Sequence, residues 1–275
     1  MNDDNRNELC KTKYPIMLVH GIGYTDEGEH EYWGRIPEVL RSYGAEVCFG
    51  CQPSFGTVSE NAAVIKKSAL KVISSGASKI NFIAHSKGGL EARYLISCLG
   101  MAEHTASLTT IATPHRGIRS MDKLYSRASH SLHFLLDLFN TMLRVDGGVP
   151  PENNKVYAEL SAEYAEIFNE LVPDAEGVYY QSYAFDMKNS LSDPAMGMFH
   201  RIIRRNEGLN DGFVSVDSAK WGNFRGVVTG PGKIGVSHPN AVDSRQRPLR
   251  DPRGRIFDIT DLYVSIASEL KEMGF

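Results

Sequence analysis

The sequence predicts an α/β protein with a mostly parallel central sheet and helices on both faces. Up to residue 112, short apolar runs alternate with longer segments of helical periodicity, an alternation that is typical of a parallel sheet covered on both sides. A serine between small residues ends one apolar run, and a largely helical segment interrupts the alternation after Arg119. With 275 residues and 42% hydrophobic content, the chain can form one large domain over residues 1–275.

The predicted strands and helices alternate in chain order. We expect strands over residues 14–19, 45–50, 79–84 and 107–112, and helices over 31–43, 59–75 (opened by Ser59) and 86–98. Helical periodicity then covers residues 120–172, before a strand resumes over 177–185. We interpret the segment from about 120 to 172 as a helical cap inserted into the domain, close to the pocket.

Residues 79–89 hold the most informative motif. An apolar strand runs into Ser86, and the small residues Ala84 and Gly88 stand two positions before and after it. A serine on a sharp strand-to-helix turn has a strained backbone and leaves room only for Gly or Ala at those positions. The motif therefore predicts that Ser86 is a nucleophile. The other interpretation is a helix N-cap that happens to lie between small residues.

A glycine turn after the first strand predicts an oxyanion loop. The strand ends at His20 and Gly21 and continues as Ile22. Acyl transfer needs two backbone N–H groups aimed at the oxygen of the tetrahedral intermediate, one after the nucleophile and one from an early strand-end loop. The candidates are the backbone amides of Ile22 and Lys87. The alternative is that the glycines only make a tight turn.

The acid and the base are expected downstream of the serine, in the order acid and then histidine. His238 lies in a loop-like stretch beyond the last predicted strand, and Asp211 lies in an Asn-Asp-Gly turn. We predict a triad of Ser86, Asp211 and His238, with Asp217 and Asp243 as competitors for the acid role. The alternatives are a turn-forming aspartate at 211 and an exposed loop imidazole at 238.

With these motifs in place, residues 14–25, 79–117 and 208–243 resemble the bacterial triacylglycerol lipases of the α/β-hydrolase superfamily. The resemblance implies an α/β-hydrolase fold and cleavage of lipid esters through an acyl-enzyme on Ser86. It also implies that the block Thr113-Pro-His-Arg-Gly117 shapes the pocket wall and that His115 is structural rather than catalytic. Asp217 stands where many of these lipases have a disulfide-bonded cysteine, and Asn240 where they often have a calcium-binding aspartate. No cofactor is therefore expected, and the motif does not support calcium.

The predicted cap carries a broad apolar face. Its candidate substrate-binding residues recur at helical spacing and are Leu132, Leu135, Leu136 and Phe139. Such a face either packs as ordinary core or covers the serine and opens toward a lipid surface. We expect an acyl-binding pocket lined by these residues and transient contact with a lipid–water interface. His130 and His133 lie three positions apart without an evident acidic partner, so no metal is assigned.

Composition narrows the class of protein. A net charge of −3 and a pI near 6.3 give no basic footprint for nucleic acid, and no apolar run reaches membrane-spanning length. The first residues are polar and lack an apolar signal core, as expected of a cytoplasmic protein or of a secreted one whose signal peptide has been removed. The four cysteines, Cys10, Cys48, Cys51 and Cys98, are too few for a disulfide framework, so most are expected to be packing residues.

Two other functions stay open. Carboxylesterases and phospholipases use the same triad, because chain-length preference depends on pocket volume rather than on the catalytic residues. A catalytically silent α/β-hydrolase that serves as a binding protein is disfavoured, since such a member is expected to have lost a triad residue or an oxyanion glycine. The expected partner is thus a lipid or a small ester substrate.

Overall fold

A six-stranded parallel sheet forms the centre of the computed structural model, which describes residues 8–23, 26, 32–120 and 154–275. The strand order is β2-β1-β3-β4-β5-β6, and every neighbouring pair is parallel. The strands are β1 Ile16–Val19, β2 Val47–Phe49, β3 Ile80–His85, β4 Thr105–Ile111, β5 Tyr179–Phe185 and β6 Asn223–Val228. A separate antiparallel pair consists of β7 Leu249–Arg250 and β8 Ile256–Phe257. The predicted fold class is therefore confirmed.

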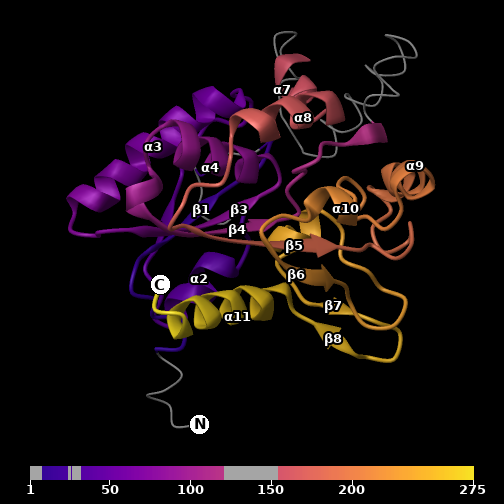
Figure 1. Ribbon diagram of the computed structural model, residues 1–275. Helices are drawn as coiled ribbons and strands as arrows, with labels where there is room; N and C mark the ends of the chain where they lie inside the picture. The colour runs from indigo at the N-terminus through magenta and orange to yellow at the C-terminus, as the bar shows by residue number, and fades with distance from the viewer. Residues whose placement is uncertain (1–7, 24–25, 27–31, 121–153) are drawn as a thin grey trace.

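Helices cover both faces of the sheet, with α3 and α4 on one side and α2 and α11 on the other (Figure 1). The α-helices described are α2 Ile36–Ser42, α3 Val58–Ser74, α4 Lys87–Cys98, α7 Asn154–Ala158, α8 Ala162–Leu171, α9 Gly197–Glu207, α10 Val216–Ala219 and α11 Ile259–Glu272. The chain runs outward from β1 to β2 and then returns to the other side of β1 for β3. In open α/β sheets, ligands bind outside the carboxyl ends of the strands at such a reversal.

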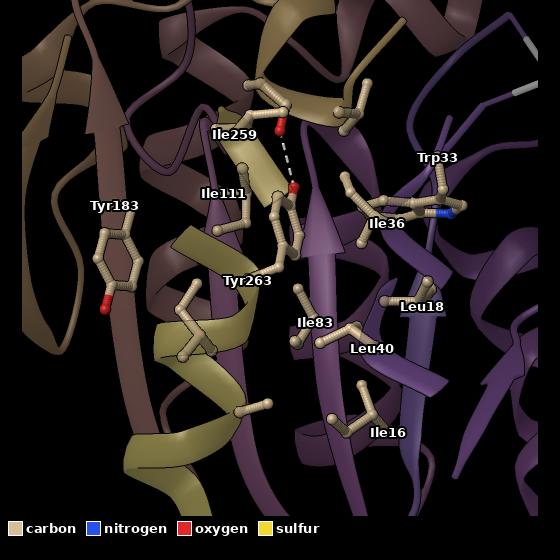
Figure 2. Packing of buried hydrophobic residues seen from close by; sticks show 14 of the residues in the cluster. Ile16, Leu18, Trp33, Ile36, Leu40, Ile83, Ile111, Tyr183, Ile259 and Tyr263 are labelled. Atoms are coloured by element: carbon tan, nitrogen blue, oxygen red, sulfur yellow. Dashed lines mark hydrogen bonds between the residues drawn. The ribbon is translucent and has the colours of Figure 1, made fainter. Parts of the chain in front are cut away.

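The core beneath α2 and α11 fixes one of the loops at this end of the sheet. Ile83 and Ile111 from the sheet pack with Leu40 of α2 and Tyr263 of α11 (Figure 2). The Tyr263 hydroxyl donates a hydrogen bond of 2.8 Å to the Ala241 carbonyl. Ala241 lies in the short 3-10 helix Pro239–Val242, so the core anchors the segment that immediately follows His238.

Three helices begin at positions that differ from the sequence prediction, and the one expected over 86–98 does so by a single residue, at Lys87. The helix expected over 31–43 begins only at Ile36, because Gly34 makes a turn with φ +50° in close contact with Asp243. The helix expected to open at Ser59 begins at Val58 with Thr57 as its N-cap. Thr57 forms a capping box with Glu60, which satisfies two backbone N–H groups that have no acceptor within the helix.

The predicted cap over 120–172 lies largely outside the described residues, which omit 121–153. Its last part is helical, as expected, in α7 and α8. The strand predicted over 177–185 is confirmed as β5, and Cys98 ends α4 after the serine. Four cysteines are free thiols, Cys10, Cys48, Cys51 and Cys98. Cys51 and Cys98 are exposed, so neither of these two is a packing residue.

Replacing Thr57 by alanine should destabilise the protein by about 1 kcal/mol, because the Glu60 backbone N–H loses its side-chain acceptor. Urea denaturation at neutral pH measures the change in the free energy of unfolding. Ser59→Ala, at an exposed position two residues further along, is the matched control. An equal or larger loss for Ser59→Ala would show that the cap had been assigned to the wrong residue.

Candidate active site

Three polar side chains meet at the carboxyl end of the sheet. His238 Nε2 lies 2.9 Å from Ser86 Oγ, and His238 Nδ1 lies 2.7 Å from Asp211 Oδ2. Ser86, Asp211 and His238 are only 4%, 1% and 8% exposed, so water competes little for these bonds. In the structure, the three residues of the predicted triad thus form one chain of hydrogen bonds.

Ser86 occupies a strained turn between β3 and α4. Its φ of +56° and ψ of −133° are unusual for a residue with a side chain. The turn is held because the Ser86 N–H donates a 2.9 Å hydrogen bond to the carbonyl of Ile111, at the end of β4. A Cβ on Gly88 would lie 2.3 Å from the His20 carbonyl oxygen. Glycine at 88 is therefore required for α4 to start this close to the end of β1.

The Asp211 loop holds its carboxylate in one orientation. One oxygen, Oδ1, accepts hydrogen bonds from the backbone N–H groups of Phe213 and Val214 at 2.8 and 2.7 Å, leaving Oδ2 for the imidazole. The His238 N–H also donates to the Asp211 carbonyl at 2.8 Å. Side-chain and backbone bonds together fix the ring of His238 relative to the acid.

Both competitors for the acid position lie elsewhere. Asp217 has a side chain that is 77% exposed and pairs with Lys220 at 2.6 Å. Asp243 is buried and bonded to the guanidinium of Arg35 at 2.8 Å. Because each carboxylate already has a cationic partner, Asp211 is the acid that the geometry gives to His238.

The two candidate oxyanion donors flank Ser86. Lys87 is the first residue of α4, and the N–H groups in the first turn of a helix have no acceptor within it. Ile22 follows Gly21, whose added Cβ would lie 2.8 Å from the Ser86 Cβ, so its loop packs directly against the serine. Across the described part of the chain, neither the Ile22 nor the Lys87 backbone N–H donates to a protein acceptor. This agrees with the sequence prediction, which needs two backbone N–H groups without a partner in the protein.

Sequence reasoning missed a hydrogen-bonded pair behind this loop. The Tyr32 hydroxyl accepts from the Gly21 N–H at 2.6 Å and lies 2.6 Å from Nδ1 of His85. The His85 ring in turn lies 4.4 Å, between centroids, from the ring of His238. Burial and the nearby His238 hold the pKa of His85 well below its usual range, which keeps the ring neutral. Tyr32 lies in the segment predicted to be a helix over 31–43, and that prediction gives no reason to expect its hydroxyl next to Gly21 and His85.

His115 has the structural surroundings that the resemblance implied. Its ring is fully buried, stacks on Trp221 with centroids 5.1 Å apart, and lies 2.9 Å from the Thr110 hydroxyl through Nε2. The guanidinium of Arg93 lies 3.7 Å from the centroid of the Trp221 ring and approaches His115 Nδ1 at 3.4 Å. These contacts use both ring nitrogens away from Ser86 and support the end of β4.

The described ranges contain neither a metal-binding cluster nor a membrane-spanning helix. No group of three or more His, Cys, Asp or Glu side chains there could hold a metal ion, and no helix there is both long and apolar enough to cross a bilayer. The predicted acyl-binding residues Leu132, Leu135, Leu136 and Phe139 lie outside the described residues, as do His130 and His133.

A parallel sheet with a strained serine at the turn after β3, bonded to a histidine that is in turn bonded to an aspartate, both from later loops, defines the α/β-hydrolase class of serine hydrolases. Comparison with known proteins agrees. A family described as "Putative serine esterase (DUF676)" matches residues 56–138. Triacylglycerol lipase 2 of Saccharomyces cerevisiae is 30% identical over 270 residues, covering 92% of this chain and 77% of the yeast protein.

A bacterial relative covers the chain almost completely. The triacylglycerol lipase of Pseudomonas fragi is 28% identical over 306 residues, or 98% of this chain and 99% of that protein. The crystal structure of the mature lipase of Bacillus licheniformis superposes with a TM-score of 0.66 at 18% identity, covering 85% of this chain and 88% of that one. The chain belongs to the triacylglycerol lipase family, and it is an ester hydrolase.

Acidification should destabilise the protein through His115. Burial, followed by the charges of Arg93 and Arg116, holds the pKa of His115 well below 6.5, whereas in the unfolded chain it returns to about 6.5. Below that pH the unfolded state binds more protons, so stability is greatest above about 6.5 and falls by at most about 1.4 kcal/mol per pH unit for each such group.

His115→Gln removes this proton-binding difference while keeping a polar side chain beside Thr110. We expect a smaller decrease in the free energy of unfolding between pH 7 and pH 5 in the variant, measured by urea denaturation at several pH values. Identical slopes for the two proteins would contradict the assignment.

Proposed function

We propose that this ester hydrolase cleaves lipid esters, triacylglycerols above all, through an acyl-enzyme on Ser86. The observation that carries the proposal is the continuous chain of hydrogen bonds from Ser86 through His238 to Asp211, at 2.9 and 2.7 Å. The relatives named triacylglycerol lipase support the choice of substrate class.

In the proposed first half-reaction, Ser86 Oγ attacks the ester carbonyl and His238 Nε2 accepts its proton. His238 then returns the proton to the leaving alcohol, and in the second half-reaction the same nitrogen activates the water that releases the fatty acid. Asp211 Oδ2 holds Nδ1 protonated, which leaves Nε2 free to act as the base.

The backbone amides of Ile22 and Lys87 would stabilise the oxyanion of each tetrahedral intermediate. Removal of one such donor typically costs about 3–4 kcal/mol of transition-state stabilisation. The Tyr32 hydroxyl supports this role indirectly, because it fixes the Gly21 N–H next to Ile22 and links the loop to His85. The donors are thus held in place before the substrate binds.

A mixed apolar and basic surface supports contact with a lipid–water interface. Leu191, Met198 and Leu209 are 82%, 38% and 42% exposed, and they lie in or beside α9, which also exposes Arg201 and Arg205. Apolar side chains interspersed with arginines suit the boundary between acyl chains and anionic headgroups. The polypeptide from 187 to 209 leads directly into the Asp211 loop, and the Met187 N–H donates to the Asn210 carbonyl at 2.8 Å. The cap residues Leu135 and Phe139 stay a sequence-based proposal for the acyl pocket.

Hydrolysis of p-nitrophenyl butyrate and of emulsified p-nitrophenyl palmitate, by the native chain and by Ser86→Ala, tests the function. We expect the native chain to cleave both esters, and Ser86→Ala to lose activity by at least about 10⁴-fold while keeping its fold by circular dichroism. Cleavage of butyrate alone would favour a carboxylesterase, and near-native turnover by Ser86→Ala would exclude the mechanism. An inactive native chain would favour the silent binding protein.

Asp211→Asn should lower kcat by about 10³–10⁴-fold, because the amide no longer holds His238 in the required tautomer. Asp217→Asn, which removes only an exposed ion pair, should leave kcat within about two-fold. Steady-state kinetics on a soluble short-chain ester compares the two variants. If Asp217→Asn proved the more damaging change, Asp211 would not be the catalytic acid.

A further inference from the structure

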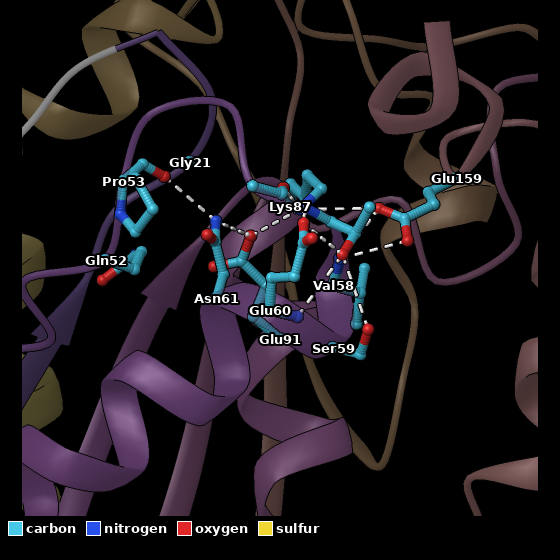
Figure 3. Close-up of polar contacts among 12 residues, drawn as sticks. Gly21, Gln52, Pro53, Val58, Ser59, Glu60, Asn61, Lys87, Glu91 and Glu159 are labelled. Atoms are coloured by element: carbon cyan, nitrogen blue, oxygen red, sulfur yellow. Dashed lines mark hydrogen bonds and ion pairs between the residues drawn. The ribbon is translucent and has the colours of Figure 1, made fainter. Parts of the chain in front are cut away.

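The side chain of Lys87 is buried next to the nucleophile, although the proposed chemistry uses only its backbone. Lys87 is 1% exposed, and its ammonium donates to the Gly56 carbonyl and to the Glu91 carboxylate, both at 2.7 Å (Figure 3). A second carboxylate, that of Glu159, lies 3.6 Å from the ammonium. Burying an ammonium group destabilises a protein unless the charge is paired. The two carboxylates therefore offset the cost of burying Lys87 beside Ser86.

Glu159 connects this cluster to two further elements. It follows α7 directly, and its two carboxylate oxygens accept from the backbone N–H of Val58, the first residue of α3, at 3.1 and 2.9 Å. Burial raises the pKa of Glu159, while the ammonium of Lys87 and the Val58 N–H act to lower it. Glu159 therefore spans the start of α3 and the start of α4.

The loop before α3 is tightly fitted to the same cluster. A Cβ on Gly56 would lie 1.9 Å from Oδ1 of Asn61, so a larger residue at 56 would require the Asn61 side chain to move. Asn61 Nδ2 donates to Glu91 at 2.8 Å and to the Pro53 carbonyl at 3.1 Å. Lys87, which bonds to Gly56, is thus held by a loop that cannot shift without disturbing its neighbours.

We propose that Lys87 and Glu159 form a positioning pair that fixes the Lys87 backbone amide for oxyanion binding. This inference rests on the proposed function, in which that amide is an oxyanion donor. The amide and the side chain share one Cα, and the side chain is held by the Gly56 loop, α4 and the segment after α7. A donor misplaced by about 1 Å can cost about 10²-fold in rate. The pair acts through the amide and does not itself touch the reacting atoms.

Glu159→Gln tests the pair with little change in shape. Glutamine keeps an oxygen for the Val58 N–H but removes the charge that faces Lys87. We expect kcat on a soluble ester to fall about ten-fold with KM within about two-fold, and the affinity for an alkylboronic acid, which forms a tetrahedral adduct on the serine, to fall in parallel. Glu163→Gln, at an exposed position on α8, is the matched control and should match the native enzyme.

A double-mutant cycle separates positioning from general destabilisation. Lys87→Met should lower kcat more than Glu159→Gln, the double variant should be less impaired than the product of the two single effects predicts, and Lys87→Arg should recover part of the loss. If Glu159→Gln does not fold, as judged by thermal unfolding, Glu159→Asp replaces it, because the shorter carboxylate withdraws from Lys87.

The outcomes distinguish this inference from the proposed function. Native kcat and boronic acid affinity in a folded Glu159→Gln, with Ser86→Ala inactive, would overturn the positioning pair alone. A change in KM without a change in kcat would do the same. Activity retained by Ser86→Ala would instead overturn the proposed function.

Discussion

The close approach of two turns is the constraint on which the rest of the site depends. The turn after β1 and the turn that carries Ser86 after β3 come from neighbouring parallel strands, so they end at the same edge of the sheet. They can touch only because Gly21 and Gly88 lack side chains: a Cβ at either position would lie within 2.8 Å of Ser86 or of the His20 backbone. The geometry of the proposed oxyanion site is therefore a property of backbone packing.

The acid and the base reach this edge by a different route. Asp211 and His238 lie in loops on either side of β6, and they are joined by backbone as well as side-chain hydrogen bonds. The segment after His238 is anchored to the core through Tyr263 of α11. A rigid sheet edge thus presents the serine, while two mutually bonded loops present the imidazole to it.

The sequence was sufficient for features with a local signal. Adjacent residues alone predict the βα alternation, the strand-serine-helix turn and the Asn-Asp-Gly loop. The structure has these features in the expected order. Contacts between distant residues had no such signal: His85 meets Tyr32 across 53 positions, and Val58 meets Glu159 across 101. The helix predicted to open at Ser59 begins one residue earlier, at Val58, because Thr57 and Ser59 are both good caps and only the Glu60 contact distinguishes them.

The bond between Ser86 and His238 joins positions 152 residues apart. The elements that carry the serine, from β1 to β4, are contiguous in sequence, whereas His238 follows β5 and β6 and its segment is anchored by α11. Pairings of such long range form late, since the entropy of closing the intervening chain must be overcome first. During refolding, recovery of ester hydrolysis would therefore report the arrival of the C-terminal half at the edge of the sheet that carries Ser86.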